Sequence, residues 1–379
     1  MNISYCFASA KGDILIDEAV LDRKFSTGPS RFHEFLTLRD FFDCVKGLLV
    51  ANEGAAIRGM LSQVLDRPVK IDEIEGIVIR YEKYGTLYQV CSVHAAIGDS
   101  LARICVTVAL ADVPQQILEQ EYALLEQFRE DSNLGYLPRV YRKDWAEASR
   151  AGQSEKFLVV FSEWFEGYDE WHFQSHEGVT KAFVWDMRNG YRYLSEEQTF
   201  DLICQASRIL TLYYDVETGR RIMPWHHGAG DFVVNVSETG LDVKLITVRG
   251  YEPINCPGGE KDPLRSLCIF CLETLTRMRI DKWEGMEEST WADPFVVEAA
   301  MKGFIQGLKA KETEHALEGL SVAQVIEELR SFPEDRMKSV IKEGFVDLEG
   351  YKSPDYVLIS WNLERHMSQI RDALWKLTG

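Results

Sequence analysis

The side chains best suited to chemistry gather in the segment 224–252, PWHHGAGDFVVNVSETGLDVKLITVRGYE. His226 and His227 stand near its start and Asp231 follows, and imidazole together with carboxylate suits proton transfer or metal binding. A hydrolase or another metal-dependent enzyme would use these three side chains, although no further ligand follows at a recognisable spacing. Neighbouring residues on a strand point to opposite faces, so at most one histidine would join Asp231 unless the loop bends.

The same residues also have structural interpretations. His227 can hydrogen-bond to the backbone of its own loop, and the structural interpretation is the favoured one for His226. Arg249, just past the last strand-like run of the segment, can pair with an anion or with Asp231. For Arg249 an ordinary salt bridge is the default expectation.

A hairpin and a helix are expected to position these residues. The β-branched runs Phe232–Val236 and Val243–Val248 are joined by a polar, glycine-containing turn, a pattern that predicts a β-hairpin. Before them an amphipathic helix is predicted over 195–216, where Ser195 and Gln198 have the spacing of a capping box.

The first half of the chain changes from helical spacing to a period of two. Two helices are predicted at Arg39–Asn52 and Ala55–Leu65, with no residues suited to chemistry. Strands and one helix then follow in the order Glu75–Lys83, Thr86–Ala95, Leu101–Leu110, helix Gln115–Arg129, Arg139–Arg142 and Lys156–Trp164. Later helices are predicted at Asp262–Met278, Pro294–Lys309, Val322–Ser331 and Asn362–Leu377.

The order of these elements, together with the segment 224–252, resembles the protein-kinase-like and aminoglycoside-phosphotransferase-like families over about residues 75–310. The resemblance implies an α+β, bilobal protein-kinase-like fold with N- and C-terminal helical extensions. It divides the chain into an N-terminal helical extension at 1–72, a small N-terminal lobe at 73–168, a helical C-terminal lobe at 169–316 and a C-terminal helical tail at 317–379.

The resemblance assigns candidate roles in the small lobe. A kinase needs a lysine on the third strand, and Thr107 stands at that position in Ile104-Cys105-Val106-Thr107, with Arg103 four positions upstream. The helix glutamate corresponds to Glu121, with Glu119 as an alternative. Gly85 is all that remains of a glycine-rich phosphate loop, and a plain hairpin turn explains it better.

The catalytic loop aligns with the family in two registers. Without a gap, His227 begins the motif, Val234 takes the position of the metal-binding Asn, and Thr247 takes that of the metal-binding Asp thirteen residues later. Shifted by two, the loop offers Asp231 as the base and Asn235 as a magnesium ligand. A threonine hydroxyl cannot replace a carboxylate on Mg²⁺.

These two registers imply different functions. The gapless register, which the missing lysine also favours, implies a pseudokinase-like protein that binds a small-molecule ligand or a protein partner in the cleft between the lobes. The shifted register implies an atypical small-molecule phosphotransferase that uses ATP and Mg²⁺, with Asp231 as base and Asn235 on the metal. Trp164, Tyr168, Trp171, His172 and Trp185 crowd the expected hinge, where packing between the lobes is favoured over an adenine site.

Composition narrows the partners and the compartment. The net charge of −18, with no long Lys/Arg run, argues against a nucleic-acid or anionic-membrane partner. The eight cysteines lie mostly in apolar runs, as reduced buried thiols do, and the Cys268–Cys271 pair is expected in a helix core rather than at zinc. No signal peptide and no run of about 18 apolar residues is visible, so a cytoplasmic protein is expected.

Overall fold

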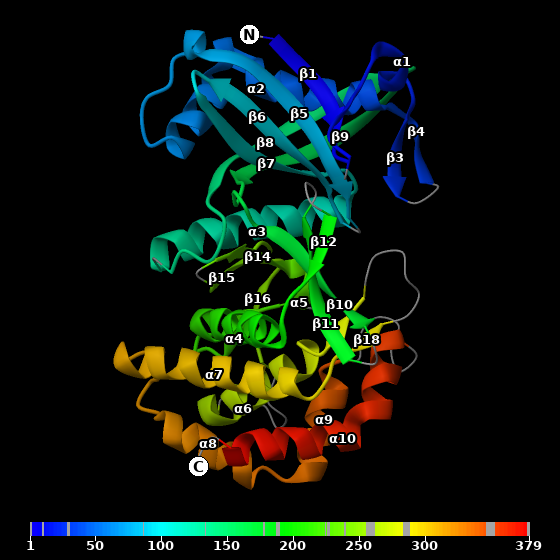
Figure 1. The fold of residues 1–379 in the computed structure, drawn as a ribbon. Coiled ribbons are helices and arrows are strands. Elements are labelled where there is room, and N and C mark those ends of the chain that lie inside the picture. Colours follow the sequence, from blue (N-terminus) through cyan, green and yellow to red (C-terminus); the bar gives the residue numbers. More distant parts are fainter. Residues whose placement is uncertain are drawn as a thin grey trace. The chain divides into compact units, whose positions relative to one another are not determined.

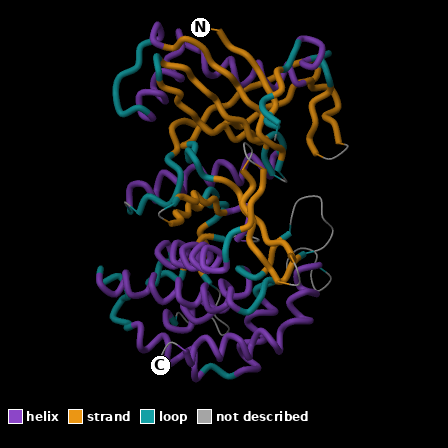
Figure 2. The backbone as a smooth tube through the Cα atoms, in the orientation of Figure 1, coloured by secondary structure: helices purple, strands orange, loops and turns teal. Residues whose placement is uncertain are grey.

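The protein, analysed as a computed structural model, has an α+β fold (Figures 1 and 2). The structure describes residues 2–9, 11–28, 31–85, 87–132, 134–176, 179–186, 190–223, 225, 228–238, 240–254, 262–282, 289–345 and 353–376. The chain divides into two compact units. Unit 1 comprises Met1–Glu166 with Met187–Gly190, and unit 2 comprises Gly167–Asp186 with Tyr191–Gly379.

One sheet of seven strands forms the framework of unit 1 in the described part of the chain. Its order is β2-β1-β5-β6-β7-β9-β8, and neighbouring strands are antiparallel except for β1 and β5, which are parallel. The strands are β1 (Asn2–Phe7), β2 (Ile14–Leu15), β5 (Ile74–Tyr84), β6 (Gln89–Ile97), β7 (Ser100–Ala109), β8 (Val140–Arg150) and β9 (Gln153–Glu163). The predicted succession of three strands, a helix and two strands is confirmed.

Helices cover both faces of this sheet. The long α2 (Leu38–Val64) packs on one face, and α3 (Asp112–Asp131) contacts β7, β8 and β9. Along β9, the α2-facing core takes Phe157, Val159 and Phe161, so that the alternate buried residues Leu158 and Val160 lie on the other face. This burial on both faces explains the nearly continuous apolar run of β9.

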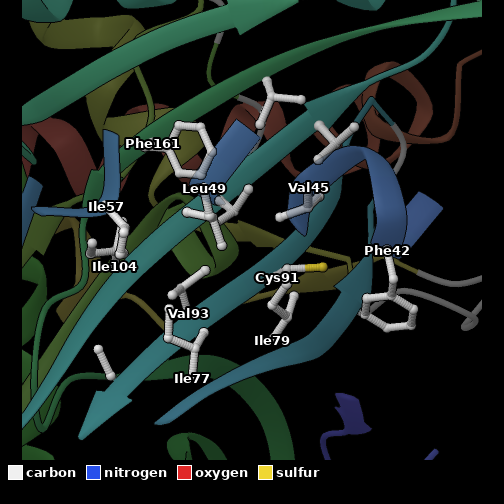
Figure 3. Close-up of a cluster of buried hydrophobic side chains, with 14 of the residues drawn as sticks. Phe42, Val45, Leu49, Ile57, Ile77, Ile79, Cys91, Val93, Ile104 and Phe161 are labelled. Atoms are coloured by element: carbon white, nitrogen blue, oxygen red, sulfur yellow. The ribbon is translucent and has the colours of Figure 1, made fainter. Parts of the chain in front are cut away.

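The core between α2 and the sheet is shown in Figure 3. Phe42, Val45 and Leu49 of α2 lie over Ile79, Cys91, Val93 and Ile104 of three adjacent strands, and all seven side chains are fully buried. Close packing of this kind makes each methylene count, because a deleted group leaves a cavity. The helix therefore belongs to the core of unit 1.

The first 72 residues differ from the expected helical extension. They contain the helices α1 (Glu18–Leu21), α2 and the 3₁₀ turn η1 (Ile71–Glu73), but also β1, β2 and the hairpin β3 (Lys24–Gly28)–β4 (Arg31–Thr37). Strand β1 pairs with β5 from Asn2↔Gly76 to Phe7↔Tyr81. A six-residue strand near the sheet edge has too short a pattern to be recognised from periodicity alone.

The two helices predicted in this region are the two halves of α2. They are separated at Ala51–Gly54, where Asn52, Glu53 and Gly54 have φ of 52°, 57° and 71°. A Cβ on Gly54 would lie 2.7 Å from Ile71 Cδ1, so the positive φ favours glycine there and a larger residue would make the Ile71 side chain shift.

Unit 2 has its own sheet, which was not predicted in full. Its order is β12-β11-β10-β14-β15, and its β14–β15 hairpin is the one expected from the sequence. The strands are β10 (Asp169–His176), β11 (Val179–Asp186), β12 (Gly190–Tyr193), β14 (Phe232–Ser237) and β15 (Gly240–Leu245). Two short pairs join β13 (Arg220–Ile222) with β16 (Tyr251–Pro253) and β17 (Ile280–Asp281) with β18 (Thr290–Trp291).

Helices make up the rest of unit 2. They are α4 (Glu196–Tyr213), the turn-like α5 (Gly228–Asp231), α6 (Pro263–Arg277), α7 (Phe295–Thr313), α8 (Val322–Ser331), α9 (Glu334–Glu343) and α10 (Pro354–Lys376). The predicted helix over 195–216 is confirmed with its capping box. Helices α4 and α7 touch through glycines: a Cβ on Gly303 would lie 2.0 Å from Cys204 O. Among the described residues, no helix is long and apolar enough to cross a membrane.

The last helix is attached through a buried histidine, His366. The Thr276 hydroxyl donates to Leu272 O at 2.8 Å, so it accepts from His366 Nε2 at 3.0 Å. His366 Nδ1 then accepts from Arg279 Nη1 at 3.2 Å. This arrangement requires a neutral imidazole, and burial together with the Arg279 charge holds the pKa of His366 well below its usual value.

The attachment of α10 is therefore expected to weaken in acid. The unfolded chain protonates His366 near pH 6.5, whereas the folded chain does so only at a lower pH. The stabilisation is thus complete above about pH 6.5 and is lost below it, by up to about 1.4 kcal/mol per pH unit. Amide hydrogen exchange in α10, corrected for the intrinsic pH dependence, should show less protection at pH 5 than at pH 7.

His366→Gln is the matched control, because glutamine does not titrate. Its α10 protection should be lower than that of the wild type at pH 7 but should change little between pH 7 and pH 5. Equal pH dependence in the two proteins would assign the effect to another group. His94 is one such group, because burial and the charges of Arg103 and Arg80 lower the pKa of His94 to about 4.

Candidate functional site

Asp231 stands at the end of a sharp turn that leads into β14. Within α5, Ala229 is extended (φ −66°, ψ 139°) and Gly230 has φ 83°, a value that favours glycine. Gly228 is packed closely, because a Cβ there would lie 3.1 Å from Met278 Sδ and 3.4 Å from the Trp171 ring. The turn therefore holds Asp231 in one place, where it is buried.

The Asp231 carboxylate is paired with Arg249. Arg249 Nη2 donates to Asp231 Oδ1 at 2.9 Å, and the exposed fractions of the two side chains are 21% and 8%. The backbone also links these segments, since Ile246 N donates to Asp231 O at 3.0 Å. The salt bridge expected as the default for Arg249 is thus confirmed, and the carboxylate serves to balance a largely buried guanidinium.

Asn235, the candidate magnesium ligand of the shifted register, has a structural contact. It lies in β14 opposite Asp242 of β15, and its Nδ2 donates to Gly167 O at 2.9 Å. Gly167 has φ 78°, and a Cβ there would lie 2.9 Å from this Nδ2 atom. The amide thus links the hairpin to the segment that enters β10.

The positions of the gapless register are apolar or neutral. Val234 is fully buried and pairs with Val243 on one side and Asp169 on the other. Thr247 is also buried, just after β15. Val234 offers no oxygen ligand, and Thr247 lacks the carboxylate that the family places at its position.

The metal-enzyme hypothesis gains no support from the described residues. His226 and His227 lie outside them, and within the described ranges no three His, Cys, Asp or Glu side chains are grouped so that they could hold a metal ion. Of the proposed set of three, only Asp231 can be placed.

In unit 1, the candidate residues lie on the face of the sheet opposite α2. Thr107 pairs with Val90 of β6 and Val160 of β9, and it alternates with the core residues Val106 and Val108. Its side chain is a short neutral hydroxyl. It cannot supply the charge with which a kinase lysine binds phosphate.

The helix glutamate and the loop glycine are used locally. Glu121 of α3 is buried and accepts from the Tyr88 hydroxyl at 3.3 Å, while its alternative Glu119 pairs with Lys143 at 2.8 Å. Gly85 N donates to Tyr88 O at 2.7 Å, which closes the connection between β5 and β6 as a turn. The interpretation of Gly85 as a hairpin residue is supported.

A polar network on this face of the sheet was not predicted. Ser92 Oγ hydrogen-bonds to Glu82 and lies 2.7 Å from His94 Nε2, while Arg80 pairs with Glu82 and, at 2.8 Å, with Asp13. These residues come together because Arg80 is opposite Ser92, and Ser92 is opposite Cys105. These polar groups lie on the β5 and β6 part of the face that carries Thr107, whereas Leu158 and Val160 of β9 make its other part apolar.

A second buried carboxylate, Asp281 of β17, was also missed. It accepts from Phe173 N at 2.6 Å and lies 3.2 Å from His172 Nδ1. The pairing of β10 with β14 includes only Asp169 and Glu170, so Asp281 satisfies the edge of β10 beyond that point. Trp171 of β10 is fully buried and packs against Gly228. This supports a packing role for Trp171, one of the aromatic residues expected near the hinge.

Comparison with known proteins adds no family to this geometry. Neither a scan against protein-family models nor a search of curated proteins finds a match to the chain. We therefore infer the function from the residues themselves.

A double-mutant cycle tests whether Asp231 has a structural role. Removing either partner of a largely buried ion pair strands the other charge, so Asp231→Ala and Arg249→Ala should each lower the free energy of unfolding by about 3 kcal/mol. The double variant should lose less than the sum of the two, with a coupling of about 1–3 kcal/mol, measured by urea denaturation.

The exposed pair Asp43–Lys46, whose side chains are 55% and 45% exposed, provides the control cycle. Its coupling should stay below about 1 kcal/mol because solvent screens it. An Asp231→Ala variant that is as stable as the wild type, or more stable, would contradict the structural role. That result is typical of residues kept for activity.

Proposed function

We propose that this chain is a kinase-fold protein that has lost ordinary phosphotransfer and acts by binding a small-molecule ligand or a protein partner. The observation that carries the proposal is the Asp231–Arg249 pair: the one carboxylate of the catalytic-loop region that could act as the base already neutralises a largely buried guanidinium at 2.9 Å. A general base needs a proton acceptor that is available to the substrate.

Element order supports the fold part of the proposal. Unit 1 contains three antiparallel strands, a helix and two further strands, and unit 2 contains a long helix, a turn and a hairpin followed by helices. This succession resembles the small and large lobes of protein-kinase-like proteins. The two small strands β13 and β16, which flank the turn and the hairpin, pair with one another and hold this segment as one module.

The residues at the expected phosphate-binding and metal-binding positions support the proposed loss of phosphotransfer. Thr107 replaces the lysine, Thr247 replaces the metal-binding carboxylate, and Asn235 donates its amide to a backbone carbonyl. The electrostatic stabilisation on which phosphoryl transfer depends needs these charges. The Arg80–Glu82–Ser92–His94 network further favours a partner other than a nucleotide, because it places polar groups on the sheet face that carries Thr107.

We further propose that the protein works in the cytoplasm, without a nucleic-acid or membrane partner. The described cysteines Cys6, Cys44, Cys91, Cys105, Cys204, Cys268 and Cys271 are free thiols, as expected in a reducing compartment. Burial raises the pKa of Cys268 and Cys271, which suits core residues rather than reactive ones. The net charge of −18 repels polyanions.

Thermal unfolding with and without millimolar ATP and Mg²⁺ tests the proposal. Ligand at 100 times its dissociation constant would stabilise the fold by about 2.7 kcal/mol, a readily visible shift. We expect no magnesium-dependent shift, and no transfer of the γ-phosphate to small-molecule acceptors.

The opposite result has a defined meaning. A magnesium-dependent shift that Asp231→Ala abolishes and Arg249→Ala preserves would establish the alternative, an atypical phosphotransferase with Asp231 as base and Asn235 on the metal. Arg249→Ala is the matched control, because it breaks the same ion pair but keeps the carboxylate.

A further inference from the structure

The outer face of α10 exposes two tryptophans. Trp361 and Trp375 are 84% and 69% exposed, whereas Ile359, Leu363 and Ile370 on the other side of the helix are buried in unit 2. Fourteen residues separate the tryptophans, so at about 100° and 1.5 Å per residue they lie on one face about 21 Å apart. Aromatic side chains of this size are enriched at protein interfaces.

We propose that this face is the interface of a homodimer, in which α10 packs antiparallel against α10 of a second copy. Ser368 lies seven residues from each tryptophan and is exposed between them. A two-fold axis at Ser368 would place Trp361 opposite the partner's Trp375, and the reverse. The small serine at the centre allows the two helices to approach closely.

The charges beside this stripe fit a second copy of the same helix. On the helical wheel Glu364 and Arg371 fall on one flank of Ser368, and Arg365 and Asp372 fall on the other. When two copies of the helix pack antiparallel about a two-fold axis, each flank of one helix meets the same flank of the other. Glu364 then faces the partner's Arg371, and Arg365 faces the partner's Asp372, so every pair joins opposite charges.

Ion pairs within unit 2 hold the side chains of one of these flanks, Glu364 and Arg371, in place. Lys338 of α9 pairs with Glu364 at 2.6 Å, and Glu334 of α9 pairs with Arg371 at 2.7 Å. These pairs hold both side chains along the edge of α10 beside the exposed stripe. In a dimer they would form part of a polar rim around the tryptophans, as is usual for interfaces.

The area suits a dimer of moderate strength. A tryptophan buries about 150–250 Å², so the four tryptophans of two copies supply about half of the roughly 1,600 Å² of a standard interface. We therefore expect a dissociation constant in the micromolar range.

Sedimentation velocity of the full chain from 1 to 200 µM tests this inference. The wild type should pass from monomer to dimer, and Trp361→Glu should raise the dissociation constant at least tenfold. Trp145→Glu, which alters a 49% exposed tryptophan on β8, is the control and should leave the dimer unchanged. A monomeric wild type at 200 µM, or a dimer that tolerates Trp361→Glu, would overturn the proposal.

A charge swap tests the antiparallel register. In the proposed dimer, residue 365 of each copy faces residue 372 of the other. Arg365→Asp should therefore weaken the dimer, because a carboxylate would face the partner's Asp372 at both places. Adding Asp372→Arg to the same chain should restore opposite charges and the dimer. Within one helix these residues are seven positions apart and do not pair, so the rescue reports contact between copies. Failure of the double variant to restore dimerisation would rule out this register.

Discussion

A buried charge must find a partner, and this requirement shapes unit 2 around its central turn. Asp231 is balanced by Arg249 and Glu273 by Arg221 at 2.9 Å, while Asp281 accepts from the Phe173 amide and contacts His172. The Asp281 and Glu273 contacts join segments that are distant in sequence, and the Asp231–Arg249 pair joins the two ends of one hairpin. Because an unpaired ion in such surroundings is strongly destabilising, these contacts fix the course of the chain.

Buried arginines that need hydrogen-bond partners also attach the C-terminal helices to the rest of unit 2. Arg277 donates to Trp225 O, just before the turn, and to Gly344 O, while its guanidinium lies 4.2 Å from the centre of the Phe345 ring. Two residues later, Arg279 donates to Ala292 O and to the buried His366 of α10. Burial lowers the pKa of Arg279 to about 9, which shows how far these charges are removed from water. The described residues of the segment 317–379 are therefore helical and also contribute to the core of the unit.

Local patterns were predictable from the sequence, and contacts between distant segments were not. The β14–β15 hairpin, the helix over 195–216 and the succession of three strands, a helix and two strands in unit 1 follow from periodicity and turn residues, which a short window of sequence contains. The network of Arg80, Ser92 and His94 depends on the register of neighbouring strands. The bond from Phe173 to Asp281 spans 108 residues. Asp231 and Arg249 form the intermediate case, because the hairpin between them brings its two ends together.

The proposed loss of phosphotransfer draws on one observation in each unit. In unit 2 the candidate base is held by a cation that belongs to the protein, so a substrate would have to compete with a 2.9 Å charge-assisted bond. In unit 1 the position of the lysine is a threonine, and Glu121, which would hold that lysine, accepts a bond from Tyr88. A kinase site needs its lysine and its glutamate together. Under the kinase-like fold proposed above, internal contacts account for Asp231 and Glu121, and this is why we propose binding rather than phosphotransfer.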